Sequence, residues 1–264
     1  MTEHPLNPKA NRERMTQHMF EKFNVQGLFI SMPSVLSVYA TGRLTGLAID
    51  IGDSVTSVVP VNDCAPERQA IKAIDFGGRD LTERMQKLLA DVGVTLTSPA
   101  EKEIVRVMKE QLCFVAQDYE RECEQPDDAV AKTFELPDGT EVVLKQPRFA
   151  CPEAIFNPTL DGREFTGLAG LVNSSIDKCD RELRGELVAN VVVAGGSSLF
   201  PNFPQRLQGE LQQLDAKIMA PPERKILAWL GGSTLASLSD FQSRWITKEQ
   251  FEECGPEIVH QKCA

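Results

Sequence analysis

The feature that most constrains this fold is a pair of apolar segments joined by a short acidic turn. Residues 46–61 read GLAIDIGDSVTSVVPV, with two apolar runs on either side of Gly-Asp-Ser. Apolar, β-branched runs flanking a glycine-containing turn predict two antiparallel strands. Asp50 ends the first run and Asp53 lies on the turn. Two interpretations stay open: an ordinary hairpin whose acids suit turn geometry, or one side of a phosphate-binding site.

A second glycine turn follows another apolar run. Residues 191–199 read VVVAGGSSL, which predicts a strand, a turn and then a helix. Glycine lets backbone N–H groups approach a phosphate, and a helix N-terminus would add further donors. Neither turn matches the dinucleotide-binding or Walker pattern, and an ordinary turn remains the alternative at both. Asp50 and Asp53 are candidates to hold a hydrated Mg²⁺ through water molecules.

Elsewhere the pattern predicts helices and strands without regular alternation, and therefore a mixed-sheet α/β fold. An amphipathic helix is expected from Gly78 to about Val92, and Ser98-Pro99 is typical of the start of another. The Pro-Asp-Gly turn at 137–139, between TFEL and TEVVLK, predicts a hairpin. The acidic stretch 120–129 is expected to be an exposed loop, and Trp229 is expected in the core.

Charge and residue spacing exclude several function classes. The formal net charge of −10 disfavours nucleic acid as a partner, and no apolar run is long enough to predict a membrane span. The seven cysteines and three histidines lack the spacing typical of a zinc site or of Cys/His catalysis. An odd number of thiols and the absence of a secretory pattern favour a reducing, intracellular compartment.

A series of segments resembles actin, in the order in which actin carries them and over essentially all 264 residues. They read LNPKANRERMTQHMFEKF, AIDIGDSVTSVVPV, FGGRDLT, AEKEIVR, KEQLC, FELPDG, CPEAIF, VVAGGSSLFP, APPERK, WLGGSTLASLSDFQ and GPEIVHQKC. The resemblance implies an actin-like (ribonuclease H-like) two-lobed α/β ATPase fold, shared with heat-shock chaperones and sugar kinases. ATP or ADP with Mg²⁺ or Ca²⁺ would bind in the cleft between the lobes.

Against the family, Met1 falls well inside the first lobe, so we expect that lobe to be incomplete. The first phosphate hairpin and the DNase-binding loop would be absent. The resemblance assigns residues 1–40 and 227–264 to a remnant of the first (outer) lobe. It assigns 41–76 and 164–226 to the base of the second lobe, with its phosphate hairpin, and 77–163 to the small subdomain of that lobe. Uncovered strand edges and apolar surface would then favour an obligate partner or self-association.

The resemblance also assigns the nucleotide site, with Asp50 and Asp53 next to the water shell of the cation. Phe200 stands where the family has a tyrosine, and Ser54 where it has a glycine. The matching positions are Asp50, Gly52, Asp53 and Val55 in the phosphate hairpin, and Gly78, Lys109, Glu110, Gly195, Gly196, Ser197, Phe200 and Lys225 around the rest of the nucleotide.

Two positions bear on catalysis. Pro33 and Ser57 stand where the family has the glutamine and histidine that position the attacking water. Proline has no side-chain donor or acceptor, and phosphoryl transfer depends on positioning. We therefore expect no catalytic residue, no appreciable ATPase activity, and nucleotide binding that is weak or lost.

Interaction surfaces give the remaining expectations. In the segment TLDGREF (159–165), Asp161 and Arg163 replace hydrophobes of the family's plug loop, which would disfavour ordinary polymerisation because unpaired charges are costly in an apolar interface. A cleft that receives amphipathic helices from actin or actin-binding proteins is expected, unless its residues are ordinary core. Its candidate residues are Tyr39, Gly42, Leu44, Leu235, Leu238 and Phe241.

The sequence therefore leads to one main functional hypothesis and two alternatives. The first is an actin-like interaction protein of the cytoskeleton or of an actin-containing complex, without ATP hydrolysis. The second is a nucleotide-hydrolysing actin and filament subunit seen here as a fragment, and the third is an inactive remnant. The resemblance implies a cytoplasmic and cytoskeletal location, with a nuclear pool as an alternative.

Overall fold

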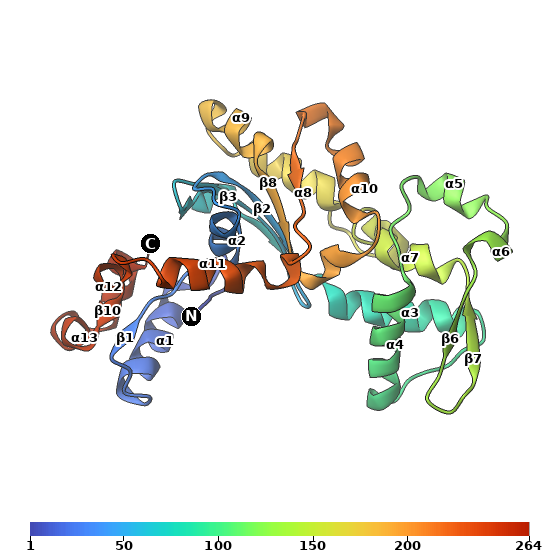
Figure 1. The fold of residues 1–264 in the computed structure, drawn as a ribbon, viewed down its shortest axis with the longest axis horizontal. Coiled ribbons are helices and arrows are strands. Elements are labelled where there is room, and N and C mark those ends of the chain that lie inside the picture. Colours follow the sequence, from blue (N-terminus) through green and yellow to red (C-terminus); the bar gives the residue numbers. More distant parts are fainter. Residues whose placement is uncertain (264) are drawn as a thin grey trace.

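A mixed six-stranded sheet forms the centre of the protein in a computed structural model that describes residues 1–263 (Figure 1). The path through the sheet is β4-β3-β2-β8-β9, with β5 also paired to β3; β2 and β3 run antiparallel, whereas β2-β8 and β8-β9 run parallel. The strands are β2 Gly46–Ile51, β3 Thr56–Asn62, β4 Ala65–Pro66, β5 Lys72–Ile74, β8 Val191–Ala194 and β9 Ile218–Met219. The mixed α/β architecture predicted from the sequence is confirmed.

Both faces of the sheet are buried, which explains why the strands read as continuous apolar runs. Leu47, Ile49 and Ile51 of β2 face a large core shared with α8 (Leu168–Ile176) and α9 (Arg181–Ala189). Ala48 faces the opposite side and packs in a separate cluster with α2 (Pro33–Ala40) and α11 (Leu227–Ala236). Successive side chains thus alternate between two cores, as a strand requires.

The region between β5 and α8 is mostly helical, and Figure 1 shows its elements grouped to one side of the central sheet. Its elements are α3 Gly78–Asp91, α4 Pro99–Leu112, α5 Tyr119–Cys123, α6 Asp127–Val130, β6 Lys132–Glu135, β7 Glu141–Leu144, α7 Pro147–Glu153 and the 3₁₀ turn η2 Pro158–Asp161. The predicted helix start at Ser98 is confirmed, because its side chain accepts from the Glu101 backbone N–H. The prediction of a loop at 120–129 is wrong: the segment holds parts of α5 and α6, and Asp118 caps the first of them by accepting from Arg121 N–H.

A third group of elements surrounds both ends of the described chain (Figure 1). It contains α1 Lys9–Glu21, β1 Gly27–Leu28, α12 Phe241–Arg244, β10 Ile246–Thr247, α13 Lys248–Cys254 and α14 Val259–Lys262. Phe20, Leu28, Ile246 and Val259 form the centre of its small apolar core. Residue 264, the last of the predicted segment 227–264, lies outside the described residues.

Trp229 is not a core residue, contrary to the prediction, because its side chain is 69% exposed. It lies two residues before Gly231, the residue of α11 that meets α2, and therefore on nearly the opposite side of the helix. Among residues 1–263, no helix has both the length and the apolar character needed to cross a bilayer.

Candidate functional site

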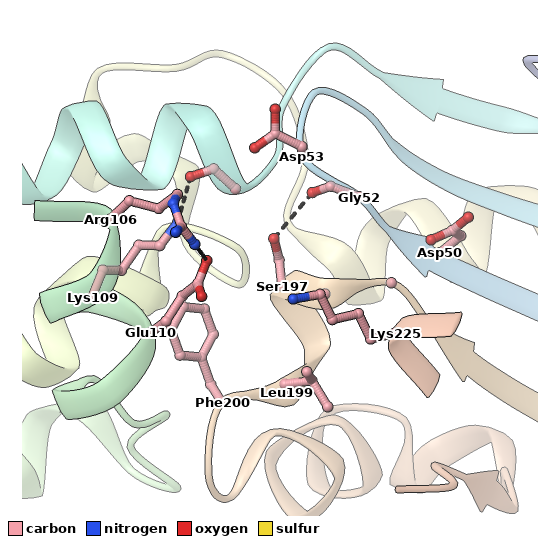
Figure 2. A pocket seen from close by; sticks show the side chains of 13 residues that line it. Asp50, Gly52, Asp53, Arg106, Lys109, Glu110, Ser197, Leu199, Phe200 and Lys225 are labelled. Carbon is pink, nitrogen blue, oxygen red and sulfur yellow. Dashed lines mark hydrogen bonds and ion pairs between the residues drawn. The ribbon is translucent and has the colours of Figure 1, made fainter. Parts of the chain in front are cut away.

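A cavity of about 560 Å³ lies where β2 and β8 end and α3 and α4 approach them (Figure 2). The carboxyl ends of parallel neighbours meet at one edge of a sheet, so the turns after β2 and β8 are brought together there. The lining residues are Asp50, Gly52, Asp53, Gly78, Arg106, Lys109, Glu110, Gly195, Gly196, Ser197, Leu199, Phe200 and Lys225. Five parts of the chain, at residues 50–53, 78, 106–110, 195–200 and 225, thus form one concave surface.

The structure places eleven of the twelve sequence-assigned nucleotide residues in this lining. The twelfth, Val55, lies outside the lining and helps to shape the hairpin, since its carbonyl accepts from Gly52 N–H at 3.0 Å. Arg106 and Leu199 also line the cavity and were not assigned from the sequence. Arg106 lies three and four residues before Lys109 and Glu110, so helical spacing places all three on one face of α4 and was a usable signal.

Gly195 allows the second turn to pass directly against the first. Its backbone has φ +91° and ψ 149°, a region that essentially only glycine occupies. A Cβ at this position would lie 2.3 Å from the Ile51 carbonyl oxygen and 2.6 Å from Asp50 Oδ1. At the neighbouring Gly196, the nearest atoms to a Cβ would be side-chain carbons of Lys225 at 3.9 Å. The close approach of the two turns therefore requires glycine at position 195 but not at position 196.

The hairpin turn presents backbone N–H groups while its carbonyl oxygens are occupied. Gly52 O accepts from Gly78 N at 3.0 Å and from Ser197 Oγ at 3.0 Å, the second bond being visible in Figure 2. Within residues 1–263, the N–H groups of residues 53, 54 and 55 donate to no protein acceptor. Successive free amides of this kind are donors that a bound anion can use.

The Asp50 carboxylate is a candidate to hold a cation, because it is buried without a hydrogen-bond donor among residues 1–263. Burial raises the pKa of its carboxyl from 3.8 to about 6. No donor in the described part of the chain hydrogen-bonds to this carboxylate, although it faces the cavity beside Gly195. No cluster of three or more His, Cys, Asp or Glu side chains suited to a metal occurs among residues 1–263. A divalent ion held by Asp50 and Asp53 would keep much of its water shell, and it would offset the burial of the Asp50 charge.

The raised pKa of Asp50 gives a stability prediction. The folded protein binds the Asp50 proton more tightly than the unfolded chain does. The contribution of this proton to the free energy of unfolding is therefore fully present below pH 3.8 and is lost as the pH rises to about 6. Without divalent cations, we expect Asp50→Asn to gain up to about 3 kcal/mol of unfolding free energy relative to wild type across this window. Urea titrations at a series of pH values measure the difference. Parallel pH profiles for the two proteins would contradict the assignment.

The basic side chains of the cavity are largely engaged. Lys109 Nζ donates to Gly78 O at 2.6 Å and to Thr82 Oγ1 at 2.9 Å, and burial lowers its pKa. Arg106 Nη1 lies 2.6 Å from Glu110 Oε1, as Figure 2 shows. Lys225 has no hydrogen-bond or ion-pair partner among the residues that the structure describes. Three cationic and three carboxylate side chains line the cavity, so their formal charges cancel.

Pro33 and Ser57 lie outside the lining. Pro33 opens α2 in its first turn, and Ser57 stands in β3 directly opposite Asp50, 4% exposed. The lining contains no histidine, glutamine or asparagine among the described residues. Its one hydroxyl, on Ser197, donates to Gly52 O.

The six residues expected to form a partner cleft do not share one cavity. Tyr39 and Leu235 line a cavity of about 320 Å³ whose wall also includes Arg244 and Lys262. Leu235 and Phe241 line a neighbouring cavity of about 460 Å³. Gly42, Leu44 and Leu238 line neither of them, and Leu44 is 51% exposed.

Comparison with protein families gives one finding for this chain. The family model described as actin matches residues 1–264.

Proposed function

The chain belongs to the actin family, and from this premise we propose that it is a cytoplasmic, actin-like interaction protein of the cytoskeleton or of an actin-containing complex. In this proposal it binds a nucleotide–divalent cation complex weakly and does not hydrolyse it. The observation that carries the proposal is the cavity between the two glycine turns, where, among residues 1–263, the hairpin turn has free amides and Asp50 has no hydrogen-bond donor. A nucleotide-hydrolysing filament subunit and an inactive remnant are the alternatives.

Charge supports weak, cation-dependent binding. Formal charges in the lining cancel, so a free polyphosphate gains little attraction from the cavity as a whole. Asp50 and Asp53 would hold the divalent ion, whose positive charge would offset the repulsion between both carboxylates and a phosphate. Lys225 and the amides of residues 53–55 would then contact the phosphates, since they have no other partner in residues 1–263.

The lining also supports the absence of hydrolysis. A water molecule attacks a phosphate efficiently only when a side chain orients it. Pro33 and Ser57 are outside the lining, and Ser197 is already committed to Gly52 O. Asp50 and Asp53, the acids nearest the turn, are the candidates for the cation in this proposal.

The test is a titration with a fluorescent ATP analogue, together with a phosphate-release assay. We expect saturable binding weaker than about 1 μM with Mg²⁺ or Ca²⁺, loss of that binding in EDTA, and no phosphate release above background. Asp50→Asn should reduce the cation dependence. Binding tighter than micromolar would contradict the weak-site proposal, and measurable turnover would favour the filament-subunit alternative.

For the interaction surface, the cavity beside Tyr39 and Leu235 suggests the chemistry of the partner. Its wall combines apolar side chains with the cations Arg244 and Lys262, which suits an amphipathic helix that has acidic residues along its edge. Actin and the proteins that bind it are the partners we propose. Self-association is the competing use of the exposed apolar side chains of Phe23 and Trp229.

A pair of leucine substitutions tests this cavity. Leu235→Arg places a charge in the apolar wall and is expected to weaken co-sedimentation with filamentous actin or capture of an acidic amphipathic peptide by about tenfold or more. Leu44→Arg is the matched control, because Leu44 is exposed and lines neither cavity. Equal effects of the two substitutions would contradict the cavity as the docking site.

A further inference from the structure

Two charged side chains of the segment 159–165, Asp161 and Arg163, fold back onto the protein. The Asp161 carboxylate is only 4% exposed and lies 3.4 Å from Arg84 Nη1 and 3.6 Å from Lys87 Nζ. Arg163 Nε donates to the same carboxylate at 3.1 Å. Arg84 also donates to the backbone of the segment, at Leu160 O, at 2.6 Å. The charges that replace hydrophobes in this segment are therefore paired within the chain, and the pairing holds the segment against α3.

Arg163 also connects this ion-pair cluster to Asp80 near the start of α3. Its Nη2 donates to Asp80 Oδ1 at 2.7 Å, and its guanidinium lies over the Phe76 ring, 5.0 Å from the centroid. The other oxygen of Asp80, Oδ2, accepts from Gly77 N–H at 2.9 Å. One carboxylate thus contacts the segment through one oxygen and the backbone at the start of α3 through the other.

The start of α3 in turn holds the hairpin turn of the cavity. Gly78 N donates to Gly52 O at 3.0 Å, and Arg79 N donates to Asp53 O at 2.8 Å. Gly77 is packed so closely that a Cβ there would lie 2.6 Å from Asp53 O. A shift of residues 77–79 therefore disturbs the turn that carries the free amides of residues 53–55.

We propose that Arg163 is a positioning residue that couples the segment 159–165 to this turn. A partner that displaces the segment breaks the Arg163–Asp80 bond. Asp80 is then no longer held in place to accept from Gly77 N–H, and the hairpin turn becomes less rigid. Nucleotide affinity and partner affinity then change by the same factor, as linkage requires. The nucleotide part of this inference rests on the proposed function, whereas the mechanical coupling is a property of the free chain.

Three substitutions separate the coupling from general destabilisation. Arg163→Met removes the bridge and keeps the length of the aliphatic side chain. Asp80→Asn keeps one oxygen to accept from Gly77 N–H but replaces the other with a donor, so the bond from Arg163 is lost. Lys87→Met is the matched control, because Lys87 is 70% exposed and neighbours Asp161 without reaching Asp80.

The primary readout is amide hydrogen exchange of the ligand-free protein. We expect the hydrogen-bonded amides of Gly52, Gly78 and Arg79 to exchange about threefold to thirtyfold faster in Arg163→Met and Asp80→Asn, with no such change in Lys87→Met. The double variant Arg163→Met/Asp80→Asn should be no faster than the faster single variant, because the Arg163–Asp80 bond that Asp80→Asn removes is already absent in Arg163→Met. Unchanged exchange at these three amides in both single variants, or fully additive effects in the double variant, would overturn the coupling.

Nucleotide titration gives a second, separable readout. If wild type binds the fluorescent ATP analogue with Mg²⁺, we expect both coupled variants to lose about threefold to thirtyfold in affinity, with Lys87→Met unchanged. Equal affinities in all four proteins would overturn the link to the ligand even if exchange changes. Absence of binding in wild type would refute the proposed nucleotide site, while the exchange experiment would still decide the coupling.

Discussion

Gly195→Ala is expected to destabilise the folded protein by about 3 kcal/mol or more and to abolish ligand binding in the cavity. The residue combines φ +91° and ψ 149° with a Cβ position 2.3 Å from Ile51 O and 2.5 Å from its carbonyl carbon. The strain would lie in the backbone of residue 195 and the overlap would be with the backbone carbonyl of Ile51, so no side-chain rotation can relieve either of them. The turn after β8 would have to withdraw from the hairpin, and the cavity lies between those two turns.

Gly196→Ala is the control for this prediction. Its added Cβ would meet nothing closer than Lys225 carbons at 3.9 Å, and its φ is not positive. We expect a change in unfolding free energy within about 0.5 kcal/mol. Thermal unfolding and the nucleotide titration, carried out on both variants, provide the measurements. Similar losses in the two variants would show that the turn does not need the close approach at Gly195.

The two glycine turns could be predicted because their signals are local. Residues 46–61 and 191–199 each show an apolar run followed by glycine, and the structure forms strands and turns there. The sequence alone did not distinguish Gly195 from Gly196. That difference comes from the distance between two turns about 140 residues apart in the chain, which only the parallel pairing of β2 with β8 determines.

Long-range packing also determines the positions and contacts of the residues that were not predicted correctly from the sequence. Arg106 lines the cavity because α3 and α4 are tied together, partly by Lys109 Nζ on Gly78 O. The pairing of Asp161 with Arg84 and Arg163 joins residues from two elements, so their charges appeared from sequence to be free for an interface. Trp229 is exposed although a core position was predicted, because an apolar helix need not be buried on every side.

The helix contact next to Trp229 gives the other large effect that we expect. Gly231 is the buried residue at which α11 crosses α2, and a Cβ there would lie 1.9 Å from Leu36 O and 2.6 Å from its carbonyl carbon. α2 packs on the sheet face formed by Ala48, Val59 and Val192, so moving either helix opens that core. We expect Gly231→Ala to cost about 3 kcal/mol or more and to lower the melting temperature by on the order of 10 °C.

Gly232→Ala, one residue further along α11, separates helix packing from helix propensity. A Cβ there would be 3.6 Å from Leu36 Cδ1, an ordinary contact, and alanine is the better helix former by about 0.5–1 kcal/mol. We therefore expect Gly232→Ala to be neutral or stabilising in the same thermal and urea unfolding experiments. Two adjacent, chemically identical changes should thus act in opposite directions, because only one points at the backbone of α2. If Gly231→Ala were as stable as Gly232→Ala, α2 and α11 could not be packed as closely as the structure places them.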